Sequence, residues 1–152
     1  MMRVAELLQK TEDRFLNSEE IAELSNFVAG MPARLTIYKK LRDREVPILQ
    51  AVADQVEQEL PSADTKDVEK SISSLMLVLR YCAMALLMNS DEAFLKQRIL
   101  RWLEQVSTAY NLRRINEVIF RHLNHLLTQE FSPAELGLLQ PLITTAQVTL
   151  IY

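Results

Sequence analysis

The chain of 152 residues is 49% hydrophobic, contains two glycines and carries a formal net charge of -3. This length is sufficient for one domain with its own hydrophobic core. The scarcity of glycine and the lack of alternating Val, Ile or Thr runs predict an all-α protein. Because the charge is small and no long block of like charge occurs, nothing favours a nucleic acid partner.

Three features of the sequence predict a soluble, cytoplasmic protein. A single cysteine excludes an internal disulfide and suits a reducing compartment. The first residues include acidic side chains and lack the long apolar stretch of a secretory signal. The most apolar run, from Leu75 to Met88, is shorter than a membrane span and is interrupted by Arg80.

The first predicted helix is amphipathic and runs from Val4 to Phe15. One of its faces carries Val4, Leu7, Leu8, Thr11 and Phe15 at helical spacing. Such an apolar stripe must be buried, either on the body of the same chain or on a neighbouring protein.

Proline, glycine and capping residues divide the remaining chain into further predicted helices, seven or eight in all. Ser18 is the candidate N-cap of the second helix, and Gly30-Met31-Pro32 predicts a break or bend after it. The next helix is expected to end near Arg42. Pro47 is then expected in the first turn of the helix that follows, where its missing N–H is tolerated.

Two further punctuation signals define the second half of the chain. Pro61-Ser62-Ala63-Asp64 separates the preceding helix from a long central helix, about Thr65 to Met88. Ser132-Pro133-Ala134-Glu135 has the pattern of a capping box with proline at the first helical position. The central helix is apolar nearly all round between Leu75 and Leu87, which indicates a helix surrounded by others.

The central helix also carries the most informative pattern, because Leu79-Arg80-Tyr81 leads into a small, apolar stretch. This resembles the pigment-holding helix of phycobiliproteins, the globin-like light-harvesting subunits of cyanobacteria and red algae. When the Leu-Arg-Tyr triplets are aligned, Ser71 replaces the thioether cysteine of that family. Ser73 and Ser74 then replace its propionate-binding arginine and its pyrrole-binding aspartate. The resemblance therefore implies a vestigial pocket without covalent bilin, at Ser71, Ser73, Ser74, Arg80 and Tyr81.

The resemblance extends over the whole chain. Glu23-Leu24, Phe27, Gly30 and Arg34-Leu35 are similar to the early pattern of the family. It implies a globin-like phycobiliprotein fold in a single domain, 1–152, with an N-terminal helical extension over 1–30 and a globin core over 31–152. The Ala-Gly-Asp that follows the pigment helix in the family is replaced here by Met88-Asn89-Ser90-Asp91, a departure that bears on the light-harvesting role.

Two residues of the central helix have alternative interpretations. Arg80 is either a structural arginine that pairs with a carboxylate or a contact for a tetrapyrrole carboxylate. Cys82 lies about 16 Å along the helix from Ser71, so it cannot replace the missing attachment point. We expect it to be a small buried hydrophobic residue, with a thiolate ligand or redox sensor as the alternative.

The sequence contains no recognisable catalytic motif, and the chain is not expected to be an enzyme. His122 and His125 lie three residues apart on a helix that begins near Leu112. Since no cysteine or second histidine pair completes a metal site, we expect solvent-facing or interface histidines and no metal. We interpret Arg113-Arg114 as the basic edge of a helix junction. The alternative is that these two arginines bind an acidic partner.

The resemblance gives the first helix a role, because the N-terminal helices of phycobiliproteins project from the globin body and contact another subunit. It implies a partner interface at Val4, Leu7, Leu8 and Phe15, in a homodimer or a hetero-complex. Docking on the chain's own body is the alternative.

The chain lacks the attachment residues but keeps the fold pattern, and in this it resembles the bilin-less relatives called bilin biosynthesis-associated globins. This resemblance implies a non-catalytic protein that binds a tetrapyrrole-biosynthesis enzyme and regulates or scaffolds bilin and chlorophyll synthesis, in the cytoplasm or peripheral to the thylakoid membrane through that partner. Two alternatives stay open, a non-covalent carrier of bilin, heme or porphyrin and a minor structural subunit of the phycobilisome. No cofactor is expected under the first hypothesis.

Overall fold

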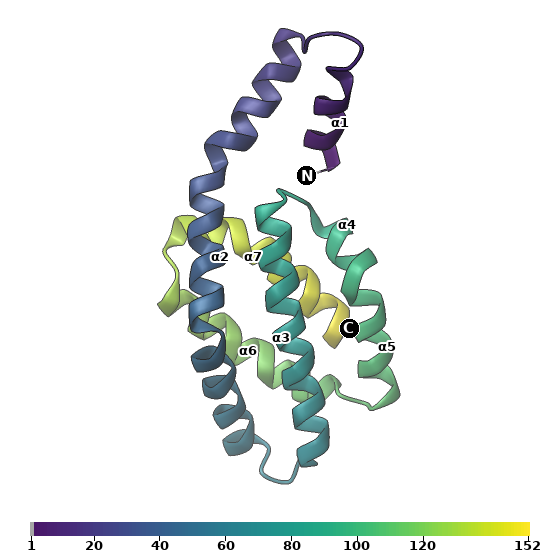
Figure 1. Ribbon diagram of the computed structural model, residues 1–152. Coiled ribbons are helices and arrows are strands. Elements are labelled where there is room, and N and C mark those ends of the chain that lie inside the picture. The colour runs from purple at the N-terminus through teal and green to yellow at the C-terminus, as the bar shows by residue number, and fades with distance from the viewer. Residues whose placement is uncertain (1) are drawn as a thin grey trace.

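The computed structural model describes residues 2–152, and within that range it contains helices, turns and loops but no strand (Figure 1). The prediction of an all-α protein is therefore confirmed. The helices, in chain order, are α1 (Met2–Lys10), α2 (Ser18–Glu59), α3 (Thr65–Leu87), α4 (Glu92–Leu95), η1 (Lys96–Leu100), α5 (Arg101–Ala109), α6 (Arg113–Glu130) and α7 (Pro133–Ile151). Since α4, η1 and α5 follow one another without a gap, the described residues form six separate helical segments, which is close to the predicted seven or eight.

The most prominent element is α2, a single helix of 42 residues. The predicted break at Gly30-Met31-Pro32 and the predicted separate helix at Pro47 are both wrong, because the two prolines lie inside α2. A proline in a helix leaves the carbonyl four residues earlier without its donor. Here those carbonyls belong to Val28 and Asp43, two exposed residues, and the helix continues past both prolines.

The start of α2 also differs from the prediction, because the N-cap is Asn17 and not Ser18. The Asn17 side chain accepts from the Glu20 backbone N–H at 2.9 Å, and the Glu20 carboxylate accepts from the Asn17 N–H at 3.0 Å. This reciprocal pair is a capping box, which satisfies two of the amides that a helix start leaves free.

The helix α1 is shorter than predicted and ends at Lys10, so Phe15 lies in the loop beyond it. Amides after Lys10 bond in turn geometry, with the Thr11 N–H donating to the Leu8 carbonyl at 3.1 Å. Figure 1 shows α1 folded back beside the first turns of α2. We call α1, the 11–17 loop and residues 18–30 of α2 the hairpin, and it projects from the remaining helices, which we call the body.

The central helix α3 has nearly the predicted bounds. Asp64 caps it by accepting from the Lys66 N–H at 2.7 Å, and the helix ends one residue before the predicted Met88. Figure 1 shows α3 beside α2, with α6 and α7 crossing both. Among the described residues, α3 is the one helix whose length and composition would allow it to cross a membrane, and half of its apolar window is buried inside the body. Core helices of soluble proteins share these properties.

The last helices are held by a buried polar contact and a well-defined cap. The Asn116 side chain on α6 donates to Ser107 Oγ on α5 at 3.0 Å and to the Leu150 carbonyl on α7 at 3.2 Å. Ser132 caps α7 in a capping box with Glu135, and Pro133 occupies the first turn, as predicted. The π-helical segment η1 connects α4 and α5 and buries Ile99 and Leu100.

The hydrophobic core lies entirely in the body. It begins at Ile37, so the predicted boundary between residues 30 and 31 falls within α2, about two turns before the core starts. Its largest fully buried side chain is Phe120 on α6. The hairpin contributes no residue to this core cluster, although Leu7 on α1 is 1% exposed.

Candidate functional site

The three serines at the positions aligned with bilin attachment lie in the second and third turns of α3. Ser71 and Ser74 are buried, while Ser73 is exposed. The Ser74 hydroxyl donates to the Lys70 carbonyl at 3.0 Å, and the Ser71 hydroxyl is buried without a hydrogen-bond partner. The helix therefore does not bring the three hydroxyls onto one surface, and their correspondence to a bilin site stays a prediction.

Arg80 lies on the side of α3 that faces α2. Its Nε donates to Glu45 Oε1 at 2.7 Å and its Nη2 to Glu45 Oε2 at 3.1 Å, and this hydrogen-bonded pairing with Glu45 raises the pKa of Arg80. A two-point bond of this kind matches the planar guanidinium to the carboxylate. The prediction that Arg80 pairs with a carboxylate is confirmed. The pair is partly exposed, so screening by water limits its contribution to stability.

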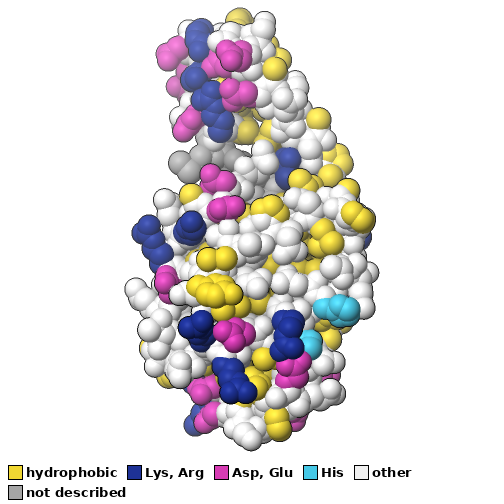
Figure 2. Space-filling model, turned by 180° about the vertical axis from the view of Figure 1, so that it is seen from behind, with side chains coloured by type: hydrophobic (Ala, Val, Ile, Leu, Met, Phe, Trp, Pro, Cys, Tyr) yellow, Lys and Arg dark blue, Asp and Glu magenta, His cyan; other side chains and the backbone are white. Residues whose placement is uncertain are grey.

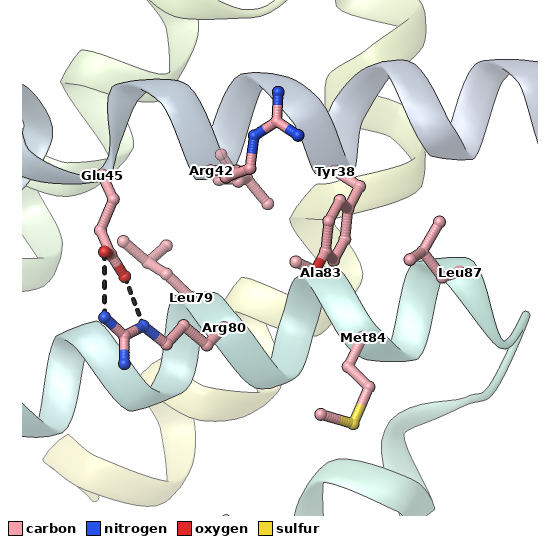
Figure 3. A pocket seen from close by; sticks show the side chains of 9 residues that line it. Tyr38, Arg42, Glu45, Leu79, Arg80, Ala83, Met84 and Leu87 are labelled. Atoms are coloured by element: carbon pink, nitrogen blue, oxygen red, sulfur yellow. Dashed lines mark hydrogen bonds and ion pairs between the residues drawn. The ribbon is translucent and has the colours of Figure 1, made fainter.

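The Arg80–Glu45 pair flanks a pocket of about 460 Å³ between α2 and α3 (Figure 3). Its apolar lining comes from both helices: Leu41, Leu79, Ala83, Met84 and Leu87. Tyr38 points from α2 toward Ala83 in the close-up. This volume falls within the range of small-molecule pockets. The polar groups at its edge are Tyr38, Arg42 and the Arg80–Glu45 pair, and Arg42 is held by Asp43 at 2.7 Å.

Tyr81 and Cys82 point into other parts of the body. The Tyr81 ring packs on Phe94 of α4, with the ring centroids 6.4 Å apart, so Tyr81 and Arg80 face different neighbours. Cys82 is fully buried, and burial raises the pKa of its thiol to about 12. The prediction that Cys82 is a small buried hydrophobic residue is confirmed. A thiol with this pKa stays protonated at neutral pH and is a poor nucleophile.

The two histidines of α6 have separate partners. His122 Nε2 lies 2.5 Å from Glu59 Oε1 at the end of α2, and Arg121 binds the other oxygen of that carboxylate. The hydrogen bonds from Arg121 and His122 lower the pKa of Glu59. His125 is exposed and contacts Gln129, as expected of a solvent-facing histidine. Within residues 2–152, no group of three or more His, Cys, Asp or Glu side chains could hold a metal ion.

The predicted partner interface is divided by the fold of the hairpin. Leu7 is buried and Val4 is half-buried, so this part of the stripe docks on the same chain. Leu8 and Phe15 stay 51% and 94% exposed. Ile21 and Val28 on α2 are also exposed, although neither belongs to the apolar stripe predicted for the first helix. The hairpin therefore closes on itself and still presents apolar side chains to solvent.

One buried carboxylate joins the two arms of the hairpin. Glu20 accepts from Arg14 Nη1 at 2.7 Å and from Lys10 Nζ at 3.0 Å, in addition to its capping bond. The hydrogen bond from Arg14 is the largest of the effects that place the pKa of Glu20 well below its usual range. Arg3 and Glu23 form a second bridge, at 2.9 Å, between α1 and α2. Figure 2 shows acidic and basic side chains gathered together on the hairpin.

Of the two arginines in the basic junction at the start of α6, Arg113 has partners within the chain. Arg113 pairs with Glu117 at 3.4 Å, and its guanidinium lies 5.9 Å from the centroid of the Tyr152 ring. Arg114 is exposed beside a small pocket at the α2–α3 loop.

The matched family agrees with this architecture. A family model described as phycobilisome protein matches residues 8–147, which include most of the hairpin and nearly all of the body. No curated protein sequence matches the chain. The family match covers most of the chain and agrees with the resemblance of the Leu79-Arg80-Tyr81 helix and with the all-α arrangement. The predicted globin-like fold is confirmed. The chain belongs to the phycobilisome protein family.

Proposed function

We propose that this member of the phycobilisome protein family carries no covalent bilin and works by binding another protein through its hairpin. The partner we propose is a tetrapyrrole-biosynthesis enzyme, which the chain regulates or scaffolds in the cytoplasm or at the thylakoid surface. The observation that carries the proposal is the exposed apolar set on the hairpin, with Phe15 at 94% and Val28 at 60% exposure. Several exposed apolar side chains on one projecting element make it a candidate interaction site.

The absence of covalent pigment is supported by the chemistry of the thiol. A thioether to a bilin requires a cysteine that the pigment can reach, and Cys82 is the only one in the chain. It is buried, with a pKa of about 12. Serine at position 71 has a hydroxyl that is far less nucleophilic than a thiol, so we expect no bond there.

The binding proposal is tested by affinity capture from a cyanobacterial lysate, followed by binding and activity assays with the purified captured enzyme. We expect the wild-type chain to retain a tetrapyrrole-biosynthesis enzyme and to change its turnover. The double variant Phe15→Glu, Val28→Glu should lose this binding. Val46→Glu is the matched control, because Val46 is an apolar residue of α2 that is 72% exposed on the body. Unchanged capture by the double variant would contradict the role of the hairpin.

A second candidate function is a non-covalent tetrapyrrole carrier, favoured by the apolar pocket of about 460 Å³ beside Arg80. The bond between Arg80 and Glu45 counts against it, because that guanidinium already has a carboxylate. Purification from a host supplied with heme and bilin distinguishes the two functions. We expect colourless protein, whereas an absorbance band lost on denaturation would support the carrier. A band that stays on the denatured chain, with zinc-enhanced fluorescence, would overturn the proposal of a bilin-free protein.

The third hypothesis, a minor structural subunit of the phycobilisome, predicts a different partner. Under that hypothesis, the hairpin would retain phycobilisome components, and the chain would sediment with intact phycobilisomes. Capture of a biosynthetic enzyme without phycobilisome components would instead support the regulatory function.

A further inference from the structure

Two charged side chains are buried in the described part of the chain, and their surroundings differ. Glu20 is 5% exposed and Arg34 is 7% exposed. Glu20 has two cationic partners and a capping amide. No ion pair among residues 2–152 includes Arg34, and its buried Nε–H has no acceptor. A buried charge without a counter-charge is unfavourable, so Arg34 is the residue whose environment is incomplete.

The Arg34 side chain is held in place by neutral groups alone. It folds back along α2, where its Nη2 donates to the Phe27 carbonyl at 2.8 Å and its guanidinium lies 4.9 Å from the centroid of the Phe27 ring. Gly30 makes this approach possible, because a Cβ at position 30 would overlap Arg34 Nη1. These contacts fix the orientation of the guanidinium but do not neutralise its charge.

Arg34 also lines a pocket of about 500 Å³, which we call the neck pocket because it lies where the hairpin leaves the body. Leu86 at the end of α3 and Leu138 and Leu142 of α7 supply its apolar wall. Asn89 and Ser90 of the α3–α4 loop add polar groups. The pocket thus combines an apolar wall with several polar side chains, and its volume lies within the range of small-molecule sites.

The charges around the neck pocket restrict the class of ligand. An arginine guanidinium favours a carboxylate or a phosphate, which it binds with paired N–H donors. Asp91 and Glu92 also line the pocket, with Lys96 as the second cation. Asp91 is occupied as the cap of α4, where it accepts from the Ala93 N–H at 3.0 Å. Because the two carboxylates balance the two cations, the lining has no net charge, and a polyanion is disfavoured. One anionic group can still pair with Arg34, which has no ion-pair partner among the described residues.

We propose that the neck pocket binds a small amphipathic carboxylate. The carboxylate of the ligand pairs with the guanidinium of Arg34, and the apolar part of the ligand lies on the wall formed by α3 and α7. This site is separate from the predicted bilin positions and from the pocket beside Arg80. It goes beyond the proposed protein-binding function and does not depend on it.

The proposal is tested by calorimetry with octanoate as the probe and octan-1-ol as its neutral counterpart. We expect saturable, one-to-one binding of octanoate to the wild-type chain. Octan-1-ol should bind at least tenfold more weakly, because it lacks the charge that Arg34 pairs with. Arg34→Met should weaken octanoate binding by about ten- to hundredfold, which corresponds to the loss of a hydrogen-bonded ion pair. Arg98→Met is the matched control and should bind like the wild type, because Arg98 is an exposed arginine that lies over Phe94.

A second variant covers the case in which Arg34→Met disturbs the fold, as measured by circular dichroism. Leu138→Trp keeps Arg34 and fills part of the pocket, because Leu138 lines it and is 45% exposed. We expect this variant to lose octanoate binding as well. The proposal is overturned if octanoate does not bind saturably, if octan-1-ol binds equally well, or if folded Arg34→Met and Leu138→Trp both bind octanoate like the wild type.

Discussion

The hairpin and the body share one continuous helix, α2, yet different forces hold them together. In the hairpin, α1 is attached through Leu7 and through ion pairs that converge on Glu20. In the body, a contiguous apolar core from Ile37 to Ile151 packs the helices around α3. The first half of α2 is therefore held mainly by charges, and the second half mainly by apolar packing.

This difference indicates that the hairpin can open without unfolding the body. Local stability follows the density of buried apolar contacts, which is low in the hairpin and high in the body. The same difference separates the two proposals. Protein binding depends on the exposed hairpin, and the proposed carboxylate site depends on Arg34 at the junction between the two regions.

The largest expected effect comes from a cavity in the body. Phe120→Ala should lower the free energy of unfolding by about 3–5 kcal/mol, because Phe120 is 1% exposed in the core. The measurement is urea denaturation followed by far-ultraviolet circular dichroism. Val46→Ala serves as the control and should stay within about 0.5 kcal/mol of the wild type, because Val46 is exposed. A small loss for Phe120→Ala would contradict the described core.

The matching change in the hairpin should act locally. Leu7→Ala removes the buried leucine of α1 and should cost about 2 kcal/mol in hairpin closure, while the global unfolding midpoint changes little. Amide hydrogen exchange in residues 3–10 should then accelerate by about thirtyfold. If the global midpoint falls as far as it does for Phe120→Ala, the hairpin and the body unfold as one unit and the comparison fails.

A pH titration should separate the ionic hairpin from the apolar body. The pKa of Glu20 lies below the ordinary value of 4.5, so its stabilising contribution is complete above that pH and is lost as the pH falls toward the folded-state pKa. Hairpin exchange, corrected for the intrinsic rate, should be constant between about pH 6 and 8 and accelerate below about pH 4.5.

The variant Glu20→Gln isolates this contribution from those of the other carboxylates. It should open the hairpin already at neutral pH and flatten the acid dependence, because the amide carries no charge for Arg14 and Lys10 to pair with. Glu12→Gln, at an exposed position of the loop, should keep the wild-type profile. An unchanged profile for Glu20→Gln would assign the acid response to another group.

The smallest effect is expected at the surface of the body. Arg80→Met breaks the bond to Glu45, but the pair is partly exposed and screened by water. The melting temperature should therefore change far less than it does for Phe120→Ala, as measured by differential scanning fluorimetry. A loss comparable to that of Phe120→Ala would mean that Arg80 has a greater structural role than its exposure indicates.

Much of the body could be predicted from the sequence, because its signals are local. The cap at Ser132, the bounds of α3 and the burial of Cys82 follow from residue types at short spacing. The helix breaks predicted at Pro32 and Pro47 were wrong, because a proline removes one backbone hydrogen bond but does not by itself end a helix. The continuity of α2 through both prolines is seen in the tertiary structure and not in the local sequence.

The candidate sites were harder to predict, because they depend on pairs that are distant in sequence. Glu45 lies 35 residues before Arg80, so the type of partner could be predicted but not its identity. Arg34 belongs to the family pattern in the sequence, but nothing in that pattern indicates that its side chain is buried. The spacing of Gly30 and Arg34, one helical turn apart, is the local signal that a guanidinium lies close to the backbone there.

The length of α2 has a mechanical consequence. At 1.5 Å per residue, its 42 residues form a rod of about 63 Å from the capping box at the hairpin to Glu59 at the opposite end. A force applied to the hairpin tip by a bound partner would therefore bend α2 most easily at Pro32 and Pro47, because each proline removes one backbone hydrogen bond of the helix. Arg34 lies half a turn beyond Pro32, so bending of the helix there would change the shape of the neck pocket.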